Sequence, residues 1–260
     1  MHELLKADGR YIYCVADTGV GVTLDKTGLD GAQVYTIPYW DICAVVHDCA
    51  AEPYSADDQE RVKKWVLAHQ TVVDAAWEKW GSVLPSALST IIKGEPGEDA
   101  GDSVRLWLEK DYHKLRQNLA KIRERAEYGV QVFWDPKVIA ENIAQASPEI
   151  RELERQTRGT AKGIAYMHKQ RLENLLRREV EDAADRFFKE CYWRIKKHVD
   201  DIRVEQVKKL QPRVQMILNV SCLVARTEYP KLGEELDEIN RMDGLSVRFT
   251  GPWPPYSFVG

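Results

Sequence analysis

The chain has 260 residues, of which 44% are hydrophobic and 30% are charged, and its formal net charge is −4 at pH 7. This composition is typical of a globular protein, and the length suggests about two domains, each with its own core. The small net charge gives no electrostatic argument for nucleic acid or an anionic membrane. No apolar stretch reaches the ~18 residues of a membrane span, and the N-terminus lacks signal-peptide features. We therefore expect a cytoplasmic protein that binds neither nucleic acid nor membrane.

The cysteines favour a reducing compartment. Their number is odd, no Cys-x-x-Cys motif occurs, and at least three of them lie inside apolar runs. Such cysteines usually behave as small buried hydrophobic residues. We expect no disulfides among Cys14, Cys43, Cys49, Cys191 and Cys222.

The N-terminal part begins with three predicted strands. Residues Arg10–Ala16 are rich in β-branched and aromatic side chains. A second strand, Gln33–Ile37, is expected to stop at Pro38. The third, Asp41–Asp48, is apolar enough to be buried on both faces, and its short separation from the second predicts an antiparallel pair.

Two helices follow these strands. The first is predicted to begin at an N-cap on Ser55, with acidic residues in its first turn, and to end at Gly81. Its apolar face comprises Val62, Trp65, Val66, His69, Val72, Val73, Ala76, Trp77 and Trp80. The second is predicted to be capped by Asp102 or Ser103, after a loop over Lys93–Gly101. Its apolar positions are Val104, Leu108, Tyr112, Leu115, Leu119, Ile122 and Ala126.

The C-terminal half opens with an alternating strand, Tyr128–Trp134, and proline signals then start helices at Asp135-Pro136 and Ser147-Pro148. A long periodic segment, Ile164–Val199, predicts a helix of ~54 Å. Since one small sheet cannot cover that length, part of the helix should project or pair with another helix. The residues Gly159–Gly163 before it form a soft point.

The last elements are a strand, a helix and a strand. Gln215–Ala225 is the most apolar strand and should be central. Thr227 is expected to cap the next helix, whose buried stripe is Leu232, Leu236 and Ile239. The final strand begins at Leu245, and Gly251 with three prolines should end it. Gln215–Ala225 is a candidate partner for this strand.

The order of elements predicts the fold class. With a weak strand near Ile202–Val207, the second half reads β-α-β-β-α-β, the order of a ferredoxin-like unit. We therefore predict an α+β protein of two domains. Residues 1–126 should form an N-terminal α+β domain with a small mixed sheet, and residues 127–260 a modified ferredoxin-like domain with a long amphipathic helix.

Two short patterns could carry chemistry. Asp17-Thr18-Gly19 resembles an aspartic-protease loop, but only one copy is present and Val20 replaces the usual serine or threonine. His47 and Cys49 share one face of an extended strand, so a Cys/His pair is geometrically possible. Functional pairs are usually distant in sequence, so a structural role is favoured for both residues. We assign no catalytic, cofactor-binding or metal-binding residue.

Several segments together make the chain similar to the gas vesicle protein family GvpF/GvpL over nearly its whole length. These segments are Gly9–Tyr13, Trp65–Trp80 with Gly81–Pro85, Glu127–Val132, Gly159–Arg171 and Leu245–Phe258. Their order and spacing carry the resemblance, and the closing segment is the most specific of them. The chain departs from the family in Pro85–Ile92, where relatives have a more basic run containing phenylalanine and glycine.

The resemblance implies a two-domain α+β protein that is an accessory or minor structural component of gas vesicles, located at the vesicle within the cytoplasm. It implies binding to the major shell protein and to other accessory proteins, and assistance in vesicle nucleation and assembly, with no enzyme activity. We expect the helix Ile164–Val199 and the tail 252–260 as contact surfaces. The alternatives are a hydrolase that uses Asp17 or Cys49 with His47, and a ferredoxin-like regulator that binds a small molecule.

Overall fold

The computed structural model describes residues 8–158, 162–207 and 214–259. Over these residues the protein is of the α+β class, with two sheets and six α-helices. The chain divides into two compact units, Met1–Glu127 with Pro252–Gly260 and Tyr128–Gly251. Residues 252–260, predicted to belong to the second domain, group by their contacts with the first unit.

The sheet of the first unit has six strands. They are β1 (Gly9–Ala16), β2 (Thr23–Thr27), β3 (Gln33–Tyr39), β4 (Ile42–Cys49), β5 (Val83–Pro85) and β6 (Ile91–Lys93), with a short 3-10 helix η1 (Leu29–Gly31) between β2 and β3. The order is β2-β3-β4-β1-β5, and β6 also pairs with β1. Each of these pairings is antiparallel, so the prediction of a mixed sheet was wrong.

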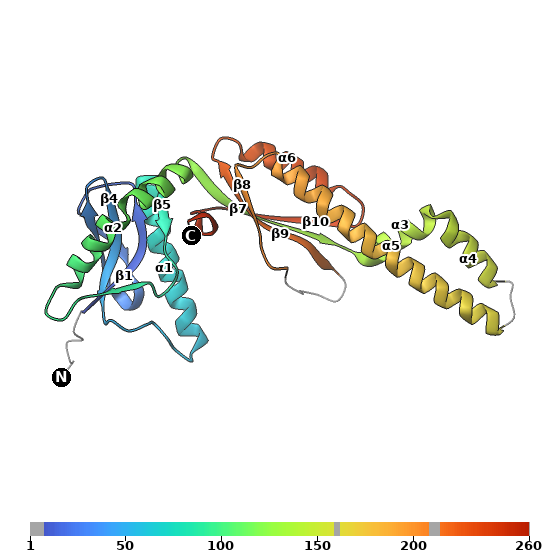
Figure 1. The fold of residues 1–260 in the computed structure, drawn as a ribbon, viewed down its shortest axis with the longest axis horizontal. Coiled ribbons are helices and arrows are strands. Elements are labelled where there is room, and N and C mark those ends of the chain that lie inside the picture. Colours follow the sequence, from blue (N-terminus) through green and yellow to red (C-terminus); the bar gives the residue numbers. More distant parts are fainter. Residues whose placement is uncertain (1–7, 159–161, 208–213, 260) are drawn as a thin grey trace. The chain divides into compact units, whose positions relative to one another are not determined.

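Strand β1 forms the centre of the first core. All eight of its residues are buried, which requires cover on both faces. The helices α1 (Gln59–Trp80) and α2 (Ala100–Ile122) both pack against it (Figure 1). Gly81 ends α1 with a φ of 75°, as predicted. Ala126, predicted in the second helix, lies instead in the next strand.

The helix starts differ from the predicted ones. Asp58 is the N-cap of α1 and accepts a hydrogen bond from the Glu60 N–H, so Ser55 is not the cap. Asp99 caps α2, and neither Asp102 nor Ser103 does. Before each helix the sequence offers several side chains that could act as the N-cap. Tertiary contacts decide which of them takes that position. Asp99 also accepts two hydrogen bonds from the buried guanidinium of Arg10.

Proline did not end the strands that it was predicted to end. β3 runs through Pro38 to Tyr39 and pairs with β4 up to Ile42. Because β2 pairs with β3 only from Gln33 to Tyr35, Pro38 lies on a locally open edge where proline is tolerated. The antiparallel pairing of the second and third strands is confirmed.

The second unit has a four-stranded sheet. Its strands are β7 (Arg125–Trp134), β8 (Asp201–Val204), β9 (Gln215–Ala225) and β10 (Leu245–Trp253), in the order β10-β7-β9-β8. The bounds of β9 and its interior position are as predicted. The last strand, however, pairs with β7 and not with β9, so the candidate partner was wrong. β10 is an edge strand and continues through Pro252 for the same reason that β3 passes through Pro38.

Four helices belong to this unit, namely α3 (Pro136–Ala146), α4 (Pro148–Arg158), α5 (Lys162–Lys196) and α6 (Tyr229–Asn240). Asp135 caps α3 as predicted, whereas α6 begins after Glu228 and not at a Thr227 cap. With 35 residues, α5 is about 52 Å long, and α4 packs alongside its beginning (Figure 1). The soft point Gly159–Gly163 lies partly outside the described residues.

The C-terminal tail is bound to the first unit by a buried carboxylate. Glu127 is 9% exposed, and its two oxygens accept hydrogen bonds from the N–H and the hydroxyl of Ser257, each at 2.7 Å. Pro254, Pro255 and Phe258 are buried, the last at 3% exposure. The tail is therefore part of the core of the first unit, and Trp253, at 43% exposure, is its exposed aromatic side chain.

Phe258→Ala should destabilise the protein by about 3 kcal/mol, because it removes a buried aromatic ring and leaves a cavity. Trp253→Ala removes a larger ring that is 43% exposed, and we expect it to cost less than about 1 kcal/mol. Urea unfolding of the two variants measures the difference. Equal losses of stability would show that the tail does not contribute to the core as described.

Candidate functional site

The first candidate site is a buried cluster of tyrosine and histidine side chains in the first unit. The ring of His47 (β4) stacks on that of Tyr11 (β1) with their centroids 4.9 Å apart. The Tyr11 hydroxyl accepts a hydrogen bond from the Ser89 N–H, which leaves its own proton for Nδ1 of His69 (α1) at 2.8 Å. Tyr54, from the loop before α1, hydrogen-bonds Nε2 of His47 at 2.9 Å.

Burial keeps both histidines of this cluster neutral. It lowers the pKa of His47 to about 4, with only partial opposition from Asp48 and Asp30. It lowers the pKa of His69 to about 4 as well, although the Ser86 backbone opposes the change. Within the described part of the chain, Nδ1 of His47 has no hydrogen-bond partner, so protonation there would leave a buried charge without an acceptor.

Cys49 and His47 do not form an activated pair. Both point to the buried side of β4, as the period of a strand predicted. His47 nevertheless uses Nε2 for Tyr54, and burial raises the pKa of the Cys49 thiol to about 11. A thiol with this pKa is protonated near neutral pH and is a poor nucleophile.

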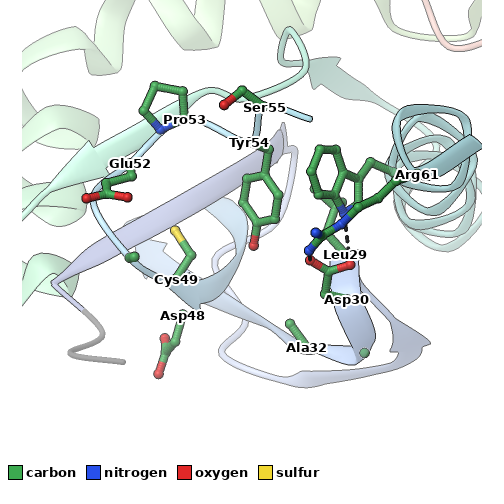
Figure 2. A pocket seen from close by; sticks show the side chains of 13 residues that line it. Leu29, Asp30, Ala32, Asp48, Cys49, Glu52, Pro53, Tyr54, Ser55 and Arg61 are labelled. Carbon is green, nitrogen blue, oxygen red and sulfur yellow. Dashed lines mark hydrogen bonds and ion pairs between the residues drawn. The ribbon is translucent and has the colours of Figure 1, made fainter. Parts of the chain in front are cut away.

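A pocket of about 490 Å³ opens beside Cys49 and Tyr54 (Figure 2). Asp30 accepts hydrogen bonds from Trp65 Nε1 at 2.8 Å and from Arg61 at 3.3 Å. The Arg61 guanidinium in turn lies 4.8 Å from the centre of the Trp65 ring. The charged groups of this wall therefore pair with each other, and the contacts explain how the first turns of α1 are held against η1.

Asp17 is held by two arginines. Its side chain is 16% exposed and pairs with Arg116 and with Arg123, the latter at 2.7 Å. Burial alone would raise the pKa of Asp17, but the hydrogen bonds from these arginines lower it below its ordinary value. An aspartic-protease site needs two carboxylates that share one proton. The arrangement at Asp17 is that of a structural ion pair.

The second candidate site is an apolar groove in the second unit. It has a volume of about 530 Å³ and lies between α3, α5 and the ends of β7 and β9. Its apolar walls are Trp134, Pro136, Ala140, Leu176, Val180 and Ala184. The exposed polar residues Glu173, Arg177, Glu181 and Gln215 complete it. The groove lies on the long helix predicted to be a contact surface, and an apolar side chain could bind there.

Sequence reasoning missed several residues of these sites. Tyr54 lies in a loop and Asp30 in the short 3-10 helix η1, where no periodicity marks them. Pro136 and Ala140 contribute to the groove only through the packing of α3 on α5. Over the described ranges, no helix is both long and apolar enough to cross a membrane. Within the same ranges, no three side chains of histidine, cysteine, aspartate or glutamate gather as ligands for a metal ion.

Comparison with known proteins identifies the family. The model of the family described as gas vesicle synthesis protein GvpL/GvpF matches residues 9–260, which span both units. The chain belongs to the GvpL/GvpF family. It is 34% identical to gas vesicle protein L1 of Halobacterium salinarum, over 99% of this chain and 92% of that protein. It is 29% identical to gas vesicle protein L of Haloferax mediterranei, over 99% and 89% of the two chains.

Two crystal structures of GvpF/GvpL members share the fold. GvpF from Anabaena sp. PCC7120 superposes with a TM-score of 0.73 at 19% identity, over 97% of this chain and 98% of that one. GvpF from Microcystis aeruginosa gives a TM-score of 0.65 at 16% identity, over 97% and 99%. Both similarities cover the two units of the chain described above.

The neutral histidines predict a pH dependence of stability. Because folding lowers the pKa of His47 and His69 from about 6.5 to about 4, the unfolded chain takes up protons first. Stability should be fully present above pH 6.5 and should fall between about pH 6.5 and 4, by up to about 1.4 kcal/mol per pH unit for each histidine. Urea unfolding at a series of pH values measures this slope.

The double variant His47→Gln/His69→Gln should lose most of that slope. His113→Gln, the same change at an exposed position of α2, should keep it. An unchanged slope in the double variant would mean that other groups cause the loss of stability in acid.

Proposed function

We propose that this protein is an accessory or minor structural component of gas vesicles that binds the major shell protein and assists vesicle nucleation and assembly. Its site of action would be the gas vesicle inside the cell, together with other gas vesicle proteins. The observation that carries this proposal is the match of the GvpL/GvpF family over residues 9–260, which covers both units.

The surface chemistry supports a binding role. A shell protein with a strongly apolar face would aggregate before assembly, and a partner with apolar surface could hold it in the meantime. The groove on α5 offers such a surface, and the first turns of the same helix expose Ile164, Tyr166 and Met167. The tail 252–260 is a weaker contact candidate than the sequence suggested, because its Pro254, Pro255 and Phe258 are buried in the first unit.

We further infer that the second unit is a modified ferredoxin-like fold and that the two units act as separate domains, with a boundary near residue 126. The strand order supports the first inference. β10-β7-β9-β8 places the fourth strand of the unit beside the first, and the third beside the second. The modification would be the three helices α3, α4 and α5 in the first connection.

The proposed role requires no reaction. Asp17 is committed to two arginines, and the Cys49 thiol and the ring of His47 are uncharged near neutral pH. These observations favour binding over the hydrolase alternative. The pocket in Figure 2 is the place where a small-molecule regulator would bind, but Arg61, the cation of its lining, is already paired with Asp30.

The groove predicts which substitutions weaken binding. In the double variant Leu176→Asp/Val180→Asp, two carboxylates enter the apolar wall, so retention of the purified major shell protein should fall by about ten-fold or more. The matched control, Leu67→Asp/Leu106→Asp, makes the same kind of change at two leucines of the first unit that are about two-thirds exposed, and it should bind like the wild type.

Pull-down with the immobilised protein measures retention, and circular dichroism verifies that each variant is folded. The same variants should show the same ranking when vesicles are counted in a host that lacks the wild-type gene. Failure of the wild type to retain the shell protein would contradict the proposed function. Equal retention by the groove variant would contradict only the place of binding.

A further inference from the structure

The hairpin between β3 and β4 carries a largely exposed aromatic side chain. Trp40 lies in the two-residue turn that joins Tyr39 to Ile42, and it is 72% exposed. Its ring stacks on Tyr39 with centroids 5.3 Å apart, and it meets Tyr112 of α2 edge-on at 4.9 Å. Three aromatic rings from two elements thus form one outward surface, which we call the aromatic tip.

The backbone at this position does not favour tryptophan. Trp40 has a φ of 49°, in the left-handed region that glycine and asparagine adopt readily and bulky side chains rarely adopt. Two-residue hairpin turns prefer glycine, asparagine or aspartate for this reason. A glycine or asparagine would fit the turn better and would expose less apolar surface. Folding of the hairpin therefore does not account for tryptophan here.

The remaining contacts hold the aromatic tip in one conformation. Asp41, the other turn residue, accepts a hydrogen bond from the Tyr112 hydroxyl at 2.7 Å and pairs with Arg116 at 3.3 Å. Gly19 lies against the turn so closely that a side chain there would collide with the Trp40 carbonyl. A rigid, exposed cluster of Trp and Tyr is the composition of a binding hot spot, and ordering it beforehand lowers the cost of association.

The charges near the aromatic tip favour a protein partner. Arg116, the cation at the turn, is already paired with Asp17 and Asp41. The Asp41 carboxylate remains half exposed, and Glu109 of α2 adds a second negative charge near Tyr39. Anionic lipid or nucleic acid would meet these carboxylates, whereas a protein surface with a basic side chain beside an apolar pocket would complement them.

We propose that the aromatic tip binds the major gas vesicle shell protein, with Trp40 inserted into an apolar pocket bordered by a basic side chain. This inference rests on the proposed function and adds a contact in the first unit. It differs from the groove on α5, because the tip supplies the inserted side chain and the groove would receive one.

Trp40→Gly tests the proposal, because glycine fits the positive φ and the variant should fold. Loss of a hot-spot side chain should weaken binding to the purified shell protein by about thirty-fold. Relief of the strained backbone should offset the lost ring contacts, so the melting temperature should stay within about 4 °C of the wild type. Leu67→Ala, at a 66% exposed leucine of α1, is the control and should bind like the wild type.

The outcomes separate the two claims. Wild-type binding with weakened binding by Trp40→Gly at an unchanged melting temperature supports the aromatic tip as the contact. Equal binding by wild type and Trp40→Gly overturns this inference and leaves the proposed function standing. No binding by the wild type overturns both. If Trp40→Gly changes the sedimentation of the protein alone and not its binding, the tip contacts a second copy and the proposal is wrong.

Discussion

The arrangement of the chain depends on one buried carboxylate and the segment that it holds. The first unit consists of two segments of the chain, 1–127 and 252–260. Glu127 is the last residue of the first segment, and it accepts hydrogen bonds from Ser257 in the second. A buried carboxylate is costly unless its oxygens are satisfied, and the N–H and hydroxyl of Ser257 satisfy both. The specific closing segment of the sequence is therefore used inside the first unit, where Phe258 and two prolines complete the core.

Because the tail packs into the first unit, other surfaces are better candidates for contact with a partner. Of the two predicted contact segments, the long helix keeps apolar side chains available at its groove, and the tail leaves Trp253 as its exposed aromatic ring. The aromatic tip at Trp40 adds a surface in the first unit. Both surfaces are apolar and need no titrating side chain to act.

Much of the fold was predictable because its signals are local. β9 was predicted with its observed bounds from an unbroken apolar run, and Leu232, Leu236 and Ile239 form the buried stripe of α6 as their spacing indicated. Errors arose where a local signal has more than one structural outcome. A proline ends a central strand, but a strand at the edge of a sheet can continue through it, as β3 does at Pro38 and β10 at Pro252. Whether a strand lies at the centre or at the edge of its sheet depends on how the other strands pair, and a local pattern does not contain that information.

The sites were less predictable than the fold. The shared face of His47 and Cys49 follows from the period of a strand. Their loss of reactivity follows from burial and from the hydrogen bond between His47 and Tyr54, which no local pattern encodes. The groove combines side chains from four elements. Trp40 carries a signal of its own in the sequence, because this bulky residue lies between the predicted strands Gln33–Ile37 and Asp41–Asp48, at a turn where small residues are expected.

Hydrogen exchange of the backbone amides, measured with and without the purified shell protein, tests this account most directly. In the free protein, the N–H of Ser257 should exchange as slowly as the core strand β1, because both belong to the first unit. Adding the shell protein should then slow exchange around the α5 groove and the aromatic tip and leave Ser257 unchanged. Fast exchange of Ser257 in the free protein, followed by protection when the shell protein binds, would contradict the account, because it would make the tail a contact surface.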